Sequence, residues 1–474
     1  MKKLLLVNCN TEKAPYPVPP LGLCLLSASL EENWEVSIYD CMFDEGIGLV
    51  DRVVRFNPDY IGFSIRNIDN TMPDSVYFVD IQVSQLILPV KKITRAKIIL
   101  GGSGFSIFPH ELMELTQADY GIIGEAETVF YQLLDALDKG EEVIPTGNLL
   151  IRQAAKVSKR SKHIHPGFLS DRFSEIDLKI DFTSYRERGA YSIQTKRGCA
   201  HGCIYCTYPL LEGTVFRTRK PVDIVEEIEQ AHHRLGDVMF EFVDSTFNDP
   251  RGHAEAICRE IIRRKLRVRL RTMGINPRNS SEELFELMME AGFVQIDATP
   301  DTASPALLKN LGKGFNLQEV RQMANAIRKF NLPTMWFFLF GGPGENYDTF
   351  SETLDFIDQY INPEDLVYMA SGLRVYPNTP LEKTALQEHL IKPGQSLLYP
   401  AVFYFSGGIS RDRLVELIHK ASSERINCIY SVETRPPLEM MKEAHKLRKE
   451  NKLNEPMFRT LLRIRKEWIG KGLL

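Results

Sequence analysis

Apolar residues recur along the first 140 residues in five short runs, each followed by a turn signal and a segment of helical length. Short apolar runs separated by amphipathic stretches are typical of parallel strands that alternate with helices. The pattern therefore predicts an α/β unit built on a doubly wound, Rossmann-like sheet. The runs span residues 3–8, 35–40, 59–64, 97–102 and 119–124.

A second rhythm of six apolar runs extends from Tyr191 to residue 375. Each run is again trailed by a helical stretch, so we expect parallel strands in either another open sheet or a partial barrel. The tail is expected to be mostly helical, with its basic, amphipathic end packing Leu and Ile inward. We therefore divide the chain into residues 1–140, a polar linker of 141–190, a second unit of 191–385 and a carboxyl-terminal region of 386–474.

The carboxyl ends of the first five strands form the candidate binding edge of the first unit, because ligands of doubly wound sheets bind there. Asn10, Ser64, Gly101 and Gly102 lie at these ends. The "GGSG" at 101–104 can bring a backbone close to a bulky ligand, although such a turn also serves as a plain tight connection.

The composition excludes several classes of protein. The chain has 474 residues, of which 43% are hydrophobic and 25% charged, and its formal net charge is −4. This balance gives no electrostatic reason to bind nucleic acid. No apolar run is long enough for a signal peptide or a membrane span. With eight cysteines in so long a chain, a reducing compartment is favoured, and we expect a cytoplasmic protein.

Three of the cysteines, Cys199, Cys203 and Cys206, lie within eight residues of one another, directly after the first strand of the second unit. Thiolates at this spacing wrap one metal centre, either a zinc ion or an iron–sulfur cluster. A closed zinc site needs a fourth ligand, and the only local candidate, His201, would strain a tetrahedral knuckle. A four-iron cluster on three cysteines keeps one iron open. We expect the cluster; structural zinc and inert buried thiols are the alternatives.

The segment "RGCAHGCIYC" (197–206) resembles the CxxxCxxC signature of the radical S-adenosylmethionine (SAM) superfamily, including the aromatic Tyr205 before the last cysteine. The resemblance implies a [4Fe–4S] cluster on the three cysteines, with SAM chelated at the open iron. It also implies that one electron from an external donor, such as flavodoxin or ferredoxin, cleaves SAM to a 5′-deoxyadenosyl radical. The same resemblance implies a partial (βα)6 barrel for the second unit.

Three further segments resemble SAM-contacting motifs of the same superfamily. They are "FEFVDSTFND" (240–249), "IDATPDTAS" (296–304) and "FFLFGGPGEN" (337–346). In the second segment a threonine stands where relatives often carry a ribose-binding acid. Alternatively, the glycines make a simple turn and Asp244 caps a helix. The cofactor contacts implied by the resemblance are Tyr205, Glu241, Asp244, Thr299, Gly341, Gly342, Gly344 and Glu345.

The first unit resembles the cobalamin-binding domain of cobalamin-dependent radical SAM enzymes, through "PPLGLCLLSASLEE", "YIGFS", "GGSGFSIFPHEL" and "DYGIIGEAET". Other cobalamin proteins use Asp-x-His-x-x-Gly to ligate cobalt. Here "DCMFDEG" has Met42 at the histidine's place, and no histidine precedes His110. Either cobalamin binds without a histidine ligand or the domain has lost it. We expect the first, because Ser64, Gly101 and Gly102 stay small enough to cradle the nucleotide tail.

The two resemblances together imply methyl transfer to an unactivated carbon, or less often phosphorus, of a small molecule. Ring formation or rearrangement is the alternative within the group. A methylthiotransferase and a non-enzymatic cobalamin sensor are less favoured, since the first unit lacks a suitable cysteine triplet and no basic recognition helix is apparent. Candidate grips for an anionic substrate are Arg374, at the end of the last strand, and the alternating Arg267, Arg269 and Arg271, which face either the lumen or the solvent.

Overall fold

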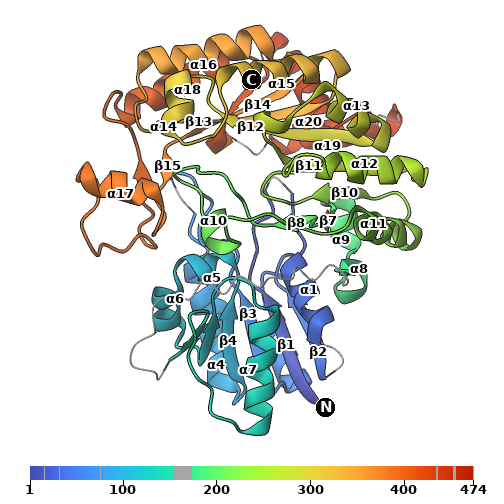
Figure 1. The fold of residues 1–474 in the computed structure, drawn as a ribbon, viewed down its shortest axis with the longest axis vertical. Helices are drawn as coiled ribbons and strands as arrows, with labels where there is room; N and C mark the ends of the chain where they lie inside the picture. Colours follow the sequence, from blue (N-terminus) through green and yellow to red (C-terminus); the bar gives the residue numbers. More distant parts are fainter. Residues whose placement is uncertain are drawn as a thin grey trace.

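The structure is a computed structural model, and it describes residues 1–14, 16–30, 33–74, 76–152, 173–433, 436–451 and 455–472. Within these ranges the chain forms two α/β units stacked end to end (Figure 1). The amino terminus lies at the lower end of the molecule in this view, and β1 (Lys2–Asn8) rises from it towards the second unit.

The first unit is the predicted doubly wound sheet. Its strands follow the order β2-β1-β3-β4-β5-β6, and the first five along the chain run parallel. All five predicted runs are strands. They are apolar throughout because both faces of the sheet are covered, so that Leu4, Leu5 and Leu6 of β1 are all fully buried. The other strands are β2 (Trp34–Asp40), β3 (Tyr60–Ser64), β4 (Lys97–Gly101), β5 (Tyr120–Ile122) and β6 (Leu149–Ile151).

Helices cover both faces of this sheet. Leu4 and Leu6 pack against α1 and α7, whereas Leu5 and Val7 face the core under α2, α4 and α6. The helices of the unit are α1 (Leu21–Leu30), α2 (Leu49–Phe56), α3 (Val79–Ile81), the π-helix η1 (Gln82–Ile87), α4 (Leu88–Ile93), α5 (Ser103–Ile107), α6 (Pro109–Thr116) and α7 (Glu127–Lys139).

The segment expected as a linker contributes structure at both of its ends. β6 pairs antiparallel with β5, so the first sheet extends beyond residue 140. Further on, α8 (Ile176–Lys179) and α9 (Thr183–Arg188) lead into the second unit. Tyr185 Oη donates a hydrogen bond to Asp40 Oδ2 at 2.6 Å, which ties α9 to the first unit. Residues 153–172, which include the basic run of the linker, lie outside the described residues.

The second unit is a partial barrel of seven parallel strands in the order β17-β14-β13-β12-β11-β10-β7. Six of them match the six predicted runs. The seventh, β17, comes from the region expected to be mostly helical, so this strand was not predicted. The strands are β7 (Tyr191–Ile193), β10 (Met239–Phe242), β11 (Arg269–Ile275), β12 (Phe293–Asp301), β13 (Thr334–Phe340), β14 (Leu366–Ser371) and β17 (Cys428–Tyr430).

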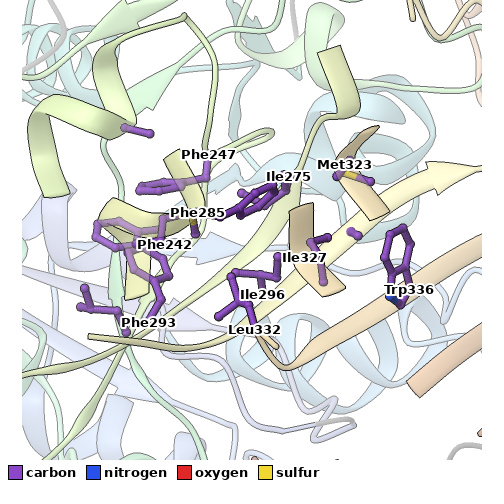
Figure 2. Close-up of a cluster of buried hydrophobic side chains, with 14 of the residues drawn as sticks. Phe242, Phe247, Ile275, Phe285, Phe293, Ile296, Met323, Ile327, Leu332 and Trp336 are labelled. Atoms are coloured by element: carbon purple, nitrogen blue, oxygen red, sulfur yellow. The ribbon is translucent and has the colours of Figure 1, made fainter. Parts of the chain in front are cut away.

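The outer face of this sheet packs against a layer of helices. Figure 2 shows part of that core, where Phe242, Ile296 and Trp336 of three strands meet Phe285, Met323 and Ile327 of the helices. The helices of the unit are α10 (Tyr208–Leu211), α11 (Pro221–Leu235), α12 (His253–Arg263), α13 (Glu282–Ala291), α14 (Pro305–Asn310), α15 (Leu317–Phe330), α16 (Tyr347–Tyr360), α17 (Pro380–Gln387) and α18 (Arg411–Glu424).

The opposite face of the sheet, which we call the inner face, is only partly covered. In β13, Trp336, Phe338 and Phe340 are buried in the outer core, while the alternate side chains of Met335 and Phe337 remain partly exposed. On β11 the inner side chain of Met273 is 38% exposed. Solvent therefore reaches the inner face, and this is the side on which a partial barrel binds small molecules.

The chain ends in two helices, α19 (Leu438–Glu450) and α20 (Met457–Gly470), that lean against each other. Phe458 and Leu462 of α20 pack on Met335 and Leu366, at the amino-terminal ends of β13 and β14. The predicted inward packing of this amphipathic end is therefore confirmed. None of the helices in the described ranges combines the length and the apolar character that crossing a bilayer requires.

Arg374 lies in the junction between the two units and not on the inner face. It belongs to β15 (Leu373–Arg374), which pairs with β16 (Phe403–Tyr404). Its Nε donates to Asp69 Oδ2 of the first unit at 3.0 Å, and its Nη atoms donate to the carbonyls of Val375, Val402 and Leu397. The guanidinium is thus fully engaged in holding the units together. The expectation that it grips a substrate is corrected accordingly.

Candidate active site

The three cysteines lie on one loop between β7 and α11, which we call the cysteine loop (residues 194–220). A small hairpin of β8 (Lys196–Arg197) and β9 (Arg217–Thr218) closes its base. Gly198 has φ +91°, and a Cβ there would lie 2.1 Å from the carbonyl oxygen of Val215. Glycine is therefore required where the chain turns into the first cysteine.

Asp244 anchors the start of this loop. Its carboxylate accepts hydrogen bonds from the Thr195 backbone N–H (2.8 Å), the Thr195 hydroxyl (2.6 Å) and the Lys196 backbone N–H (3.2 Å). The Lys196 ammonium lies 3.4 Å away, and both side chains are almost completely buried. Asp244 was expected to face the cosubstrate. The structure instead engages both of its oxygens with the loop that carries the cysteines.

The three thiols lie close enough together to influence one another. Charge on Cys199 or Cys203 raises the pKa of Cys206, and charge on Cys203 raises that of Cys199. Burial is the larger cause for all three and raises the pKa of Cys206 to about 12. Across the described ranges, no group of three or more His, Cys, Asp or Glu side chains is arranged to hold a single metal ion. Sulfurs around one zinc ion would lie ~3.8 Å apart.

His201 is engaged away from the thiols. Its Nε2 lies 2.8 Å from Asp249 Oδ2 and 3.1 Å from Asn276 Nδ2. A closed Cys3His zinc site would need this nitrogen or its neighbour to turn towards the sulfurs, so the zinc alternative loses its fourth ligand. Three neighbouring thiols without a fourth donor fit a [4Fe–4S] cluster that keeps one iron free of protein ligands.

A buried polar triad that the sequence did not reveal lies beside the cysteine loop. Tyr205 Oη donates to Asp301 Oδ2, and the Lys313 ammonium donates to both, at 3.2 Å to Tyr205 and 2.5 Å to Asp301. Burial lowers the pKa of Lys313, but the charges of Asp301, Cys203 and Cys206 and the hydrogen bond to Asp301 together outweigh burial and raise that pKa. Asp301 lies in the segment 296–304 quoted above, but nothing in the sequence relates it to Lys313, and the two come together through the fold. The triad fixes Tyr205, which was expected to contact the cofactor.

The glycine-rich turn after β13 is held by its own glutamate. Glu345 is fully buried, and its carboxylate accepts from the Gly341 backbone N–H (3.1 Å) and the Thr349 hydroxyl (2.6 Å). Gly341 and Gly344 have φ +94° and +91°, conformations that L side chains rarely adopt. Gly342 packs tightly on Leu311. The turn is thus preset at the carboxyl edge of the sheet, whereas Thr299 lies half-buried near the end of β12.

A row of polar side chains crosses the inner face. Glu241 Oε1 accepts from Arg271 Nε (2.6 Å) and from the hydroxyl of Tyr16 (2.5 Å), which reaches in from the first unit. The Arg271 guanidinium stacks on the Tyr16 ring at 3.7 Å. Nearby, burial raises the pKa of Asp297 to about 7. Of the two orientations considered for this arginine, lumen or solvent, Arg271 therefore faces the lumen. Arg267 lies before the first residue of β11.

The binding edge of the first unit is lined by small side chains. Ser64 and Gly101 are neighbours in register at the carboxyl ends of β3 and β4. A Cβ on Gly101 would meet nothing within 4 Å, so open space lies beside it. Gly102 is different: with φ +97°, its Cβ would lie 2.6 Å from the carbonyl oxygen of Ile65. Glycine is therefore required at position 102 by the turn itself. Asn10 is buried and accepts from Asn67 Nδ2 at 3.3 Å. Open space at this edge fits a bulky cofactor.

Met42 does not point into that edge. Its side chain is fully buried in the hydrophobic core of the second unit, together with Cys24 and Tyr185. The neighbouring Asp40 carboxylate accepts from Asn8 Nδ2 and from the Met42 backbone N–H. The loop that carries a cobalt-ligating histidine in other cobalamin proteins is thus used here for packing between the units.

The binding edge of the first unit meets the cysteine loop directly. Helix α10 of that loop packs against α5, which follows the "GGSG" turn. Arg197 donates to Glu125 (3.1 Å) and Glu127 (2.6 Å), and Arg217 donates to Glu125. These ion pairs are mostly buried. Groups bound at the two edges would therefore lie on either side of this contact.

The remaining described cysteines do not form a second cluster site. Cys9 and Cys41 are buried near each other, and burial raises the pKa of both thiols. Cys24 lies in α1 and faces a different core. This arrangement disfavours the methylthiotransferase alternative, which needs a second set of three cysteines.

The anchoring role of Asp244 leads to a first prediction. Asp244→Ala removes the acceptor for three loop donors and leaves the Lys196 ammonium buried without its partner. Supporting groups of this kind change metal affinity by roughly 10–100-fold, so the variant should retain far less than about four irons per chain after anaerobic reconstitution. Asp358→Ala, at a half-exposed surface pair with Arg425, is the control and should keep the wild-type iron content. Equal iron in both variants would contradict the role.

The raised pKa of Asp297 leads to a second prediction. Its ordinary value is about 3.9, so the folded protein loses stability as pH rises towards 7 and this buried carboxyl must ionise. Asp297→Asn removes that cost. The variant should melt at a higher temperature than wild type at pH 8, by roughly 2–4 °C, and by less than that at pH 5. A difference that does not depend on pH counts against the ionisation of Asp297.

Comparisons with known proteins agree with this geometry. Residues 7–134 match the B12 binding domain, and residues 193–357 match the radical SAM superfamily. The chain is 26% identical over 404 residues to an uncharacterized methyltransferase of Pyrococcus horikoshii, covering 82% of this chain and 84% of that protein. It is 26% identical over 461 residues to the tryptophan 2-C-methyltransferase of Streptomyces laurentii, covering 82% and 75%.

Solved structures share the fold over the whole chain. The radical SAM methyltransferase TsrM from Kitasatospora setae, solved with tryptophan substrate and a SAM analogue, superposes with a TM-score of 0.83 at 23% identity and full coverage of both chains. The cobalamin-dependent SAM radical enzyme OxsB gives 0.73 at 15% identity, covering this chain fully and 71% of OxsB. The chain therefore has a B12 binding domain followed by a radical SAM domain, and its relatives include cobalamin-dependent radical SAM methyltransferases.

Proposed function

We propose that this enzyme transfers a methyl group to an unactivated carbon of a small molecule bound on the inner face of the barrel. Cys199, Cys203 and Cys206 would hold the [4Fe–4S] cluster. SAM would bind beside it, along Thr299 and the turn formed by Gly341, Gly342, Gly344 and Glu345. Cobalamin would bind at the edge formed by Asn10, Ser64, Gly101 and Gly102.

One observation carries the proposal: the cysteine loop and the open edge of the first unit are packed against each other by α10 and α5. When bound, these groups supply one-electron cleavage of SAM and a methyl group on cobalt that can leave as a radical equivalent. The chain's own share is positioning and exclusion of water. The mostly buried Arg197, Arg217, Glu125 and Glu127 seal one side of the junction, and Tyr16 covers the inner face from the first unit.

We propose that cobalamin binds without a histidine ligand from the usual loop. The support is the place of Met42, which lies in the core, and the absence of any histidine before His110. A small-molecule substrate is favoured because the candidate binding side chains lie on the inner face of the barrel. A nucleic-acid substrate would instead call for a wide basic surface. An external flavodoxin or ferredoxin would deliver the electron.

Anaerobic purification followed by an absorption spectrum tests this function. We expect broad iron–sulfur absorption together with corrinoid bands. Cys203→Ala should lose the iron–sulfur absorption and keep the corrinoid bands, because the two sites lie on different units. Cys258→Ala is the control: this thiol belongs to α12 and is buried in the outer core, and the variant should keep both signals.

The same preparation, given SAM and a reductant, should form methionine, and the Cys203→Ala variant should not. A colourless wild-type protein after reconstitution with iron, sulfide and cobalamin would overturn the proposal. So would a Cys203→Ala variant that cleaves SAM as fast as wild type.

A further inference from the structure

The polar row on the inner face contains buried groups that lack partners. Ser192, Glu241, Arg271 and Gln295 lie side by side on four adjacent strands, β7, β10, β11 and β12. The Ser192 hydroxyl and Arg271 Nη2 are both buried, and neither has a hydrogen-bond partner among the described residues. Most buried polar groups in proteins are paired. Two buried donors without a partner in the same row indicate that a bound molecule accepts their hydrogen bonds.

Asp297 adds an acidic group to the same row. It is 8% exposed, and its one hydrogen bond among the described residues is a long contact of 3.3 Å from Gln295 Nε2 to Oδ1. The charge of Arg271 acts on Asp297 from a distance, but the ion pair of Arg271 is with Glu241, and Asp297 has no ion pair among the described residues. A buried carboxyl without a cation partner is best matched by a positively charged donor.

The neighbouring part of the inner face is apolar. Asp297 is in register with Met335 of β13, and Phe337 of the same strand is in register with Tyr368 of β14. The rings of Phe337 and Tyr368 lie 5.2 Å apart, and both side chains are partly exposed. The inner face therefore has two halves: polar on β7 to β12 and aromatic on β13 and β14.

We propose that the inner face binds a zwitterionic amino compound with an apolar body, that is, an amino acid or a close derivative. Asp297 accepts the protonated amine. Arg271 Nη2 and the Ser192 hydroxyl donate to the carboxylate, and Phe337 and Tyr368 contact the body. Tyr16 of the first unit holds the Arg271 guanidinium in place, so binding of the substrate carboxylate depends on the contact between the two units. The assignment rests on the proposed function, since it names the substrate class of that reaction.

Calorimetry on the reconstituted full chain, without reductant, tests the assignment with three probes. L-tryptophan carries both charged groups, tryptamine only the amine and indole-3-propionate only the carboxylate. Wild type should bind tryptophan at least about 10-fold more tightly than either single-headed probe. Asp297→Asn should remove the advantage of tryptophan over indole-3-propionate while leaving the affinity for indole-3-propionate unchanged.

Asp365→Asn is the matched control. Asp365 is also buried, burial raises its pKa to about 6, and it directly precedes β14 of the same sheet, but it pairs with Arg459 of α20. This variant should keep the wild-type order of the three probes even if it melts at a lower temperature.

The proposal is overturned if Asp297→Asn keeps the preference for tryptophan, if wild type binds indole-3-propionate as tightly as tryptophan, or if it binds none of the three probes. Because no turnover is needed, this failure is distinct from failure of the proposed function. The absorption spectrum of the same preparation reports the cluster and the corrinoid independently of probe binding.

Discussion

The contact between the carboxyl edges of two parallel sheets is the constraint on which the structure depends. Both edges are where their folds bind ligands, and the chain presses them together. Arg374 and Asp69 form a buried pair across the junction, and α10 packs on α5. A cofactor bound at each edge would then lie beside this contact. Neither sheet could provide this geometry alone.

Much of the polar chemistry near this contact supports the site and does not itself react. Asp244 holds the cysteine loop, Glu345 holds the glycine turn, and the triad of Tyr205, Asp301 and Lys313 holds the side of the cluster. Buried charges such as these stabilise little on their own, because their desolvation offsets their attraction. Their contribution is to hold the loops of the site in one conformation. Asp297 is the exception, since it is buried without a cation, and sites that keep such a group sacrifice stability for binding.

The sequence predicts the parts of this molecule whose signal is local. Eleven strands follow from apolar runs, and the cysteine loop follows from spacing. Strand β17 was missed because it lies in a region whose longer segments are helical, where it does not belong to a repeated alternation of strands and helices. Arg374 was expected in the lumen because its place at a strand end looks the same whether its partner is a substrate or Asp69. Tyr16, Asp301 and Lys313 were missed because their partners lie 12 to 225 residues away along the chain.

The central claim is that one iron of the cluster has no protein ligand and is available to SAM. Mössbauer spectroscopy of protein reconstituted with ⁵⁷Fe, recorded before and after SAM is added, tests it directly. The account predicts that one iron in four changes its isomer shift when SAM binds, while the other three keep the values of sulfur-ligated sites. Four irons that do not respond to SAM would contradict it.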